Sequence, residues 1–190
     1  MLISKFCTDN IEHSIQKFER EYKFMFPEEY KRFLLRYNGG KTPESSFKLN
    51  KIYSNIDGFY GLGQAEMYFH YDIFAKGGKL IEYINDEVIP IAANCFGDYI
   101  VIGIGRNNNG KIYFYYHDRP KKYIELIDSF KAFVSKCKSK RIKPAKSIEE
   151  RREILIAKGK GANIDDELIK IWQAEIDEYA NICQEELVLD

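Results

Sequence analysis

The sequence predicts an α+β fold in which a mainly antiparallel sheet is flanked by helices toward both ends of the chain. Apolar residues recur at helical spacing near the start and near the end, whereas short strand-like runs separated by turn residues fill the middle. Helices, strands and helices in this order are typical of antiparallel sheets and not of doubly wound parallel ones. The 190 residues, of which 45% are hydrophobic and 31% charged, are enough to bury one domain core.

Two helices are expected before the first strand. Asp9 and Glu12 have the spacing of a capping box, and the apolar face of the helix they begin comprises Ile11, Ile15, Phe18 and Tyr22. Pro27 begins the second helix, because its missing N–H costs nothing in a first turn. The Asn-Gly-Gly of residues 38–40 ends this helix through a left-handed turn, and its buried face comprises Tyr30, Phe33, Leu34 and Tyr37.

Strands are expected through the middle of the chain. Their β-branched and aromatic runs, broken by Asn, Asp and Gly, lie over residues 47–53, 58–62, 88–93, 99–104 and 111–117. A helix is predicted over residues 66–75, between the second and third strands. The last two strands flank the Asn-rich turn of residues 105–110, so we expect them to form an antiparallel hairpin.

Three helices are expected after the strands. The first starts at the Asp-Ser of residues 128–129, and the second at Ser147, which forms a capping box with Glu150. Asp165 caps the last helix, whose apolar stripe comprises Leu168, Ile171, Trp172, Ile176 and Tyr179. We expect this stripe to be buried by the core or by a partner chain, and a homodimer is one such arrangement.

Composition divides the chain into three parts. We predict a domain over residues 1–138, a basic connector over 139–146 and a helical C-terminal extension over 147–190. Residues 105–146 carry 12 basic and 3 acidic side chains, a net charge of +9, whereas residues 147–190 carry 5 and 12, a net charge of −7. Such asymmetry is typical of nucleic-acid segments and interaction tails, or of an acidic end that folds back on a basic stretch.

Several motifs, taken in order, carry a family resemblance. They are FPEEYKRFL at 26–34, YNGG at 37–40, IPIA at 89–92, FGD at 96–98, GKIYFYYHD at 110–118 and DSF at 128–130. Together they resemble the SUKH superfamily, in the branch named for the yeast Smi and Knr cell-wall synthesis regulators, over roughly residues 6–135.

The resemblance implies a fold and a function. The fold is a SUKH-like α+β domain with a mainly antiparallel sheet. The function, for many bacterial members, is that of an immunity protein that binds and neutralises a toxin delivered between cells, often a nuclease. The resemblance brings no catalytic residues, and its best-marked positions have structural interpretations in turns and helix ends: Pro27, Tyr30, Asn38, Gly39, Gly40, Gly97 and Asp98.

Patterns for catalysis, cofactors or metals are weak. Residues 105–111 imitate a phosphate-binding loop, but Ile112 stands where that loop needs a hydroxyl, and a strand follows instead of a helix. His117 and Asp118 are the most suggestive acid–base pair, yet neighbours along a strand point to opposite faces. Metal-ligand spacing is absent among the four cysteines and His13, His70 and His117. The sequence therefore predicts no enzyme, no cofactor and no metal site.

A protein partner is the favoured interpretation. The basic segment 136–146 lacks aromatic residues that would stack on bases, so nucleic-acid binding is not expected. Residues 44–98 carry eight acidic side chains, four lysines and many tyrosines, a composition that would complement the basic active site of a nuclease toxin. The candidate contacts are Asp57, Tyr60, Glu66, Tyr68, Asp72, Asp86 and Glu87. The alternatives are a solvated surface over an aromatic core, and a non-catalytic interaction scaffold related to the cell-wall regulators.

Targeting features point to the cytoplasm. The first residues lack the basic and apolar regions of a secretory signal, and no run approaches the roughly 20 apolar residues of a membrane span. The four cysteines lie far apart and are expected to be reduced thiols.

Overall fold

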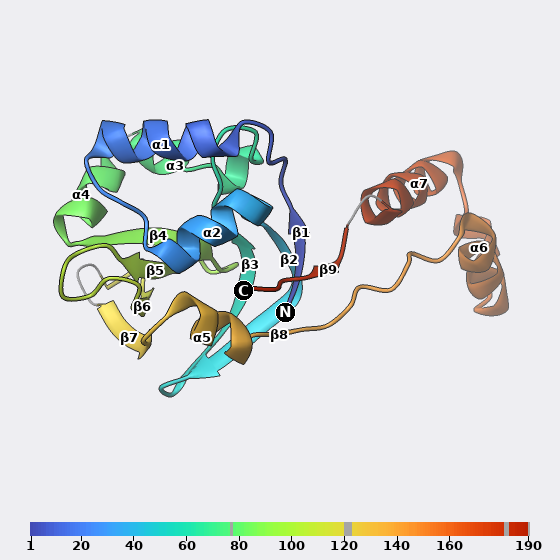
Figure 1. Ribbon diagram of the computed structural model, residues 1–190. Coiled ribbons are helices and arrows are strands. Elements are labelled where there is room, and N and C mark those ends of the chain that lie inside the picture. The colour runs from blue at the N-terminus through green and yellow to red at the C-terminus, as the bar shows by residue number, and fades with distance from the viewer. Residues whose placement is uncertain (77, 120–122, 181–182, 190) are drawn as a thin grey trace. The chain divides into compact units, whose positions relative to one another are not determined.

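The computed structural model describes residues 1–76, 78–119, 123–180 and 183–189. The chain forms two compact units. The first, called here the sheet unit, comprises Met1–Arg141 and Gln184–Asp190, and the second, the helical unit, comprises Ile142–Cys183. Figure 1 labels the elements of both.

One antiparallel sheet forms the framework of the sheet unit. Hydrogen-bonded neighbours follow the order β7-β6-β5-β4-β3-β2-β1-β9, and β8 pairs with β2. Each of these pairings is antiparallel, which confirms the predicted fold class. The strands are β1 (Leu2–Lys5), β2 (Gly40–Leu49), β3 (Ile52–Phe59), β4 (Val88–Ala93), β5 (Tyr99–Gly103), β6 (Ile112–Tyr115), β7 (Tyr123–Ile127), β8 (Lys138–Ser139) and β9 (Glu185–Glu186).

Helices precede, interrupt and follow the strands. Those of the sheet unit are α1 (Ile11–Tyr22), α2 (Glu28–Tyr37), the 3₁₀ turn η1 (Met67–Phe69), α3 (Asp72–Ala75), α4 (Lys79–Asn85) and α5 (Phe130–Lys136). The helical unit contains α6 (Ile148–Ala157), the 3₁₀ turn η2 (Gly161–Asn163) and α7 (Asp166–Ala180). The predicted capping box at Ser147 is present, with the Ser147 hydroxyl accepting from the Glu150 N–H at 3.2 Å and the Glu150 carboxylate accepting from the Ser147 N–H at 2.8 Å.

Three sequence predictions about local structure are wrong. No side-chain capping box starts α1, because Asn10 precedes it in the left-handed region at φ 58°. The predicted strands 47–53 and 58–62 are displaced, since Asn50 and Lys51 adopt φ of 46° and 68° and form the tight hairpin turn between β2 and β3. The predicted helix 66–75 is two short pieces, η1 and α3, separated by extended backbone at His70.

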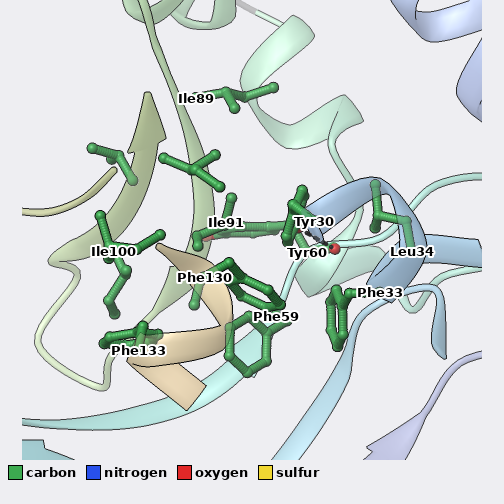
Figure 2. Close-up of a cluster of buried hydrophobic side chains, with 14 of the residues drawn as sticks. Tyr30, Phe33, Leu34, Phe59, Tyr60, Ile89, Ile91, Ile100, Phe130 and Phe133 are labelled. Carbon is green, nitrogen blue, oxygen red and sulfur yellow. Dashed lines mark hydrogen bonds between the residues drawn. The ribbon is translucent and has the colours of Figure 1, made fainter. Parts of the chain in front are cut away.

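Aromatic rings from helices and strands fill the core. The rings of Phe33, Phe59 and Phe130 meet with centroids 5.1–5.7 Å apart, which joins α2 and α5 to the sheet (Figure 2). Tyr30 is fully buried beside them, and its hydroxyl donates to the Tyr60 carbonyl at 3.2 Å. Burial raises the pKa of Tyr30 far above its usual value, so the phenol stays neutral and serves as a core hydrogen-bond donor.

The turn after α2 ties three segments together. Asn38 adopts φ 52° and ends the helix, while its side-chain amide donates to the carbonyls of Cys7 and Leu62 at 2.6 and 2.8 Å. Gly39 follows at φ 77°, and a Cβ there would lie 2.6 Å from the Phe59 carbonyl oxygen. The YNGG motif therefore positions α2 against the chain where β3 ends.

The end of the chain returns to the sheet unit. Strand β9 pairs with β1 through Leu2↔Glu186 and Ile3↔Glu185, beside the N-terminus in Figure 1. Leu187 is buried, and the Tyr37 hydroxyl accepts from the Val188 N–H at 3.0 Å. Strand β9 was not predicted from the sequence, and its pairing makes the helical unit an insertion between two strands of one sheet.

Candidate protein-interaction surface

The seven predicted contact residues lie on several elements. Tyr60 is 2% exposed and belongs to the core, so its prediction as a surface contact is corrected. Asp57 is half-buried on β3; burial raises its pKa, and the hydrogen bond from Asn55 at 2.6 Å opposes that rise. The remaining five are exposed, with three around η1 and α3 and two after α4: Glu66, Tyr68, Asp72, Asp86 and Glu87.

The η1–α3 surface, defined by Glu66, Met67, Tyr68, Asp72 and Ile73, joins exposed apolar side chains to carboxylates. Met67 is 73% exposed and Tyr68 79%, and Ile73 is exposed close by in sequence on α3. Large apolar groups held in water are a liability for a free monomer, and such patches mark interaction sites. Methionine and tyrosine are also enriched in protein interfaces.

Buried contacts beneath η1 fix this surface. The Phe69 ring packs on Gly58, where a Cβ would lie 2.7 Å from the ring, so β3 approaches η1 as closely as glycine allows. Gly61 donates its N–H to the Phe69 carbonyl at 2.8 Å and accepts from the Tyr71 N–H at 3.2 Å. Because the partly buried Phe69 packs against the core, Met67 and Tyr68 are presented to solvent by a braced turn.

His70 lies between the two exposed segments. Its Nδ1 accepts from the Asp72 N–H at 3.1 Å, which leaves Nε2 to carry the proton when the ring is neutral. Two shallow hollows adjoin at Gly63, His70 and Asp72; one continues to Lys17 and Glu21 of α1, and the other to Met67, Ile73 and Lys76. The η1–α3 surface is therefore hollowed beside its exposed apolar groups.

A second acidic and aromatic region lies on β5, β6 and β7. The rings of Tyr99, Tyr115 and Tyr123 follow one another across the strands with centroids 6.3 and 5.3 Å apart, and Tyr83 of α4 packs against the first two. The Tyr123 hydroxyl donates to the Asp86 carboxylate at 2.8 Å. Burial, and then this hydrogen bond, raise the pKa of Tyr123 above its usual value. We call these four residues the tyrosine ladder; they are more buried than Tyr68.

His117 pairs with Asp98 and not with its neighbour Asp118. The Asp98 carboxylate lies 2.8 Å from His117 Nδ1 and accepts from the His117 N–H at 3.1 Å, while Asn94 contributes a further bond at 3.2 Å. Burial raises the pKa of Asp98, but the hydrogen bonds from His117 and Asn94 outweigh burial and leave the pKa below its usual value. This network holds the Gly97 turn against the end of β6.

Other sequence motifs have structural outcomes. The Gly105 N–H donates to the Asn108 side chain at 2.8 Å, and β5 pairs with β6 up to Ile102↔Ile112, so residues 105–110 form the predicted hairpin turn.

Burial raises the pKa of Cys137 to about 12, and the four cysteines are free. Over residues 1–76, 78–119, 123–180 and 183–189, no three His, Cys, Asp or Glu side chains are grouped to hold a metal ion. None of the helices described in those ranges has the length and apolar content to cross a membrane.

Comparison with known proteins identifies the family. The model of the SMI1 / KNR4 family (SUKH-1) matches residues 12–136. The chain belongs to the SMI1 / KNR4 family. Among curated proteins, no match to the chain was found.

The family assignment confirms the resemblance inferred from the motifs. The SMI1 / KNR4 match runs from α1 to α5 and contains both the η1–α3 surface and the tyrosine ladder. The helical unit and β9 lie beyond the matched residues.

Proposed function

We propose that this SMI1 / KNR4 protein is an immunity protein that binds a cognate bacterial toxin, a nuclease, and neutralises it without catalysis. The family is known for toxin-immunity-like domains. The observation that carries the proposal is the η1–α3 surface, in which Met67 and Tyr68 are exposed on a turn that Phe69 braces from below. A surface that is already rigid loses little entropy on binding.

The apolar groups of the surface are the expected energetic anchors. A few central residues dominate most interfaces, and tyrosine is among the commonest of them. Truncation of such an anchor costs about 2 kcal/mol, which corresponds to roughly a 30-fold weaker complex. Tyr68 is the strongest candidate, because its ring is the most exposed large side chain of the surface.

The carboxylates of the surface favour a basic partner. Glu66 is paired with Lys41 at 2.8 Å, and Asp72 lies at the other end of the surface with its carboxylate 3.4 Å from His70 Nδ1. A nuclease must hold phosphate groups, so its active site is basic and would be attracted to this surface. We therefore expect association to slow as salt is added, because screening weakens the steering of exposed charges.

The test is co-purification of the full chain with toxins encoded beside it, together with protection of cells that express those toxins. Tyr68→Ala is expected to weaken binding and protection, whereas Tyr53→Ala is the matched control, since Tyr53 is similarly exposed at 73% on β3. Failure to bind or protect against any neighbouring toxin would refute the proposed function. Equal effects of the two substitutions would refute the assignment of the surface. Binding to endogenous proteins, with growth defects on deletion when no toxin is present, would favour the interaction scaffold instead.

A further inference from the structure

The helical unit presents an apolar helix edge that its neighbouring helix does not cover. At about 100° per residue, the apolar side chains of α7 from Ile171 through Trp172 to Ile169 span roughly 160° of the helix surface. Helix α6 packs against the middle of this arc, where Trp172 is buried and the Arg151 guanidinium lies 5.9 Å from the ring centroid. Ile171, at one edge of the arc, is 58% exposed.

Acidic side chains flank the exposed edge. Glu167 and Glu178 lie four residues before and seven residues after Ile171, so the three share one face of α7, and both carboxylates are exposed. Glu175, on the other side of Ile171 toward Trp172, pairs with Arg151 of α6 at 2.6 Å. Helix α7 carries five acidic residues and one lysine. A partner that packs on Ile171 would therefore meet negative charge on both sides.

The core of the helical unit is too small for its apolar content. Among the described residues of Ile142–Cys183, Trp172 is the one that the structure buries. Units of about 40 residues rarely bury enough apolar surface to be stable without a staple or a partner. The apolar arc of α7 is wider than α6 alone covers. A third helix packed on the exposed edge is the simplest way to bury the rest of the arc.

We propose that α6 and α7 bind a basic amphipathic helix of a partner protein. The apolar face of that helix packs on Ile171, and its lysine or arginine side chains pair with Glu167 and Glu178, as in other helix-in-groove complexes. This inference is independent of the toxin-binding proposal, because the helical unit lies outside the residues matched by the family.

A labelled peptide measures binding, and the single tryptophan checks the fold of the helical unit. Trp172 is the one tryptophan in the chain, so the fluorescence of the full-length protein reports on the helical unit. The probe is a synthetic leucine–lysine amphipathic helix of about 15 residues, the length of α7, with a leucine–glutamate peptide of the same pattern as its counterpart. Because Trp172 is already buried, binding is followed by the anisotropy of a fluorescently labelled peptide, and unchanged Trp172 emission shows that the helical unit stays folded. We expect the leucine–lysine peptide alone to bind in a saturable manner.

Substitutions then locate the binding face. Ile171→Asp, and separately Glu167→Lys with Glu178→Lys, are expected to weaken peptide binding about tenfold or more. Ile81→Asp is the matched control, since Ile81 is 55% exposed on α4 of the sheet unit and should leave binding unchanged.

Four results would overturn the proposal. They are no saturable binding of the lysine peptide, equal binding of the glutamate peptide, unchanged binding by Ile171→Asp, and self-association of the chain through this face in sedimentation equilibrium, which would make the occupant a second copy. A loss of sheet-unit stability in Ile171→Asp would also count against it, because the face would then be covered within the chain.

Discussion

Leu187→Ala tests whether the end of the chain is an integral part of the sheet unit. Leu187 is 6% exposed and follows β9, and its N–H donates to the Met1 carbonyl at 2.9 Å. Removing a buried leucine side chain beyond Cβ costs about 2–5 kcal/mol, and a site at the rim of a core falls in the lower half of that range. A loss of about 3 kcal/mol lowers the Tm of a unit of this size by roughly 6–12 °C.

Val188→Ala is the matched control for this substitution. Val188 is 45% exposed, and its main chain keeps the bond to the Tyr37 hydroxyl whatever its side chain. Thermal and urea unfolding followed by far-UV circular dichroism reports the secondary structure of both units, and Trp172 fluorescence identifies the transition that belongs to the helical unit. A change of less than about 0.5 kcal/mol for Leu187→Ala would refute the reasoning, because a surface site gives that value.

Three further predictions concern the turns and thiols of the sheet unit. Gly39→Ala should destabilise the protein by more than about 2 kcal/mol, since its Cβ would meet the Phe59 carbonyl, whereas Gly78→Ala, at a similar φ but with open space around it, should cost only about 1 kcal/mol in urea unfolding. The lowered pKa of Asp98 contributes stability that is present above the usual aspartate pKa of 3.8 and is lost as pH falls through the lowered value. Asp98→Asn should therefore flatten the acid limb of a curve of unfolding free energy against pH. An unchanged acid limb would argue against the His117–Asp98 network. Three cysteines are exposed and Cys137 is buried with its pKa raised to about 12, so a thiol reagent should modify three thiols in the native protein and the fourth only on unfolding; rapid reaction of all four would contradict the burial.

Elements with strong local chemistry could be predicted from the sequence. Helix α2 lies between Pro27 and the Asn-Gly-Gly of residues 38–40, and α5 begins where the Ser129 hydroxyl accepts from the Ala132 N–H at 3.1 Å. The β5–β6 hairpin surrounds a turn rich in asparagine and glycine. In each case the residues that specify the element lie within it or next to it, so no knowledge of distant contacts is needed.

Elements that depend on distant partners were missed. Strands β1, β8 and β9 have two to four residues, too few for a periodic pattern, and exist because they pair with segments far away in the chain. The turn at Asn50 and Lys51 contains no glycine to mark it. The predicted strand therefore continues to residue 53, whereas β2 ends at Leu49. Helix α4 and strand β7 were likewise overlooked because neither has a strong cap or turn signal.

The candidate surface could be predicted only in part. The sequence does not distinguish the buried Tyr60 from the exposed Tyr68, because tyrosine suits both a core and an interface. The turn that presents Tyr68 is braced by the packing of Phe69 on Gly58. These two residues are distant in sequence, so no local pattern predicts their contact. The partner of His117 was likewise beyond local inference, because Asp98 lies 19 residues earlier, in the turn before β5.

The two proposed binding regions belong to different units of the chain. The Arg141 guanidinium donates to the Gln184 carbonyl at 3.2 Å, so the chain leaves the sheet unit and re-enters it at one place. The cost of closing a loop grows slowly with its length, by about 0.6 kcal/mol for each doubling. The sheet can therefore carry the inserted Ile142–Cys183 at little expense. Because the η1–α3 surface is braced from within the sheet unit, changes to the inserted helices can alter the second partner while leaving the first surface intact.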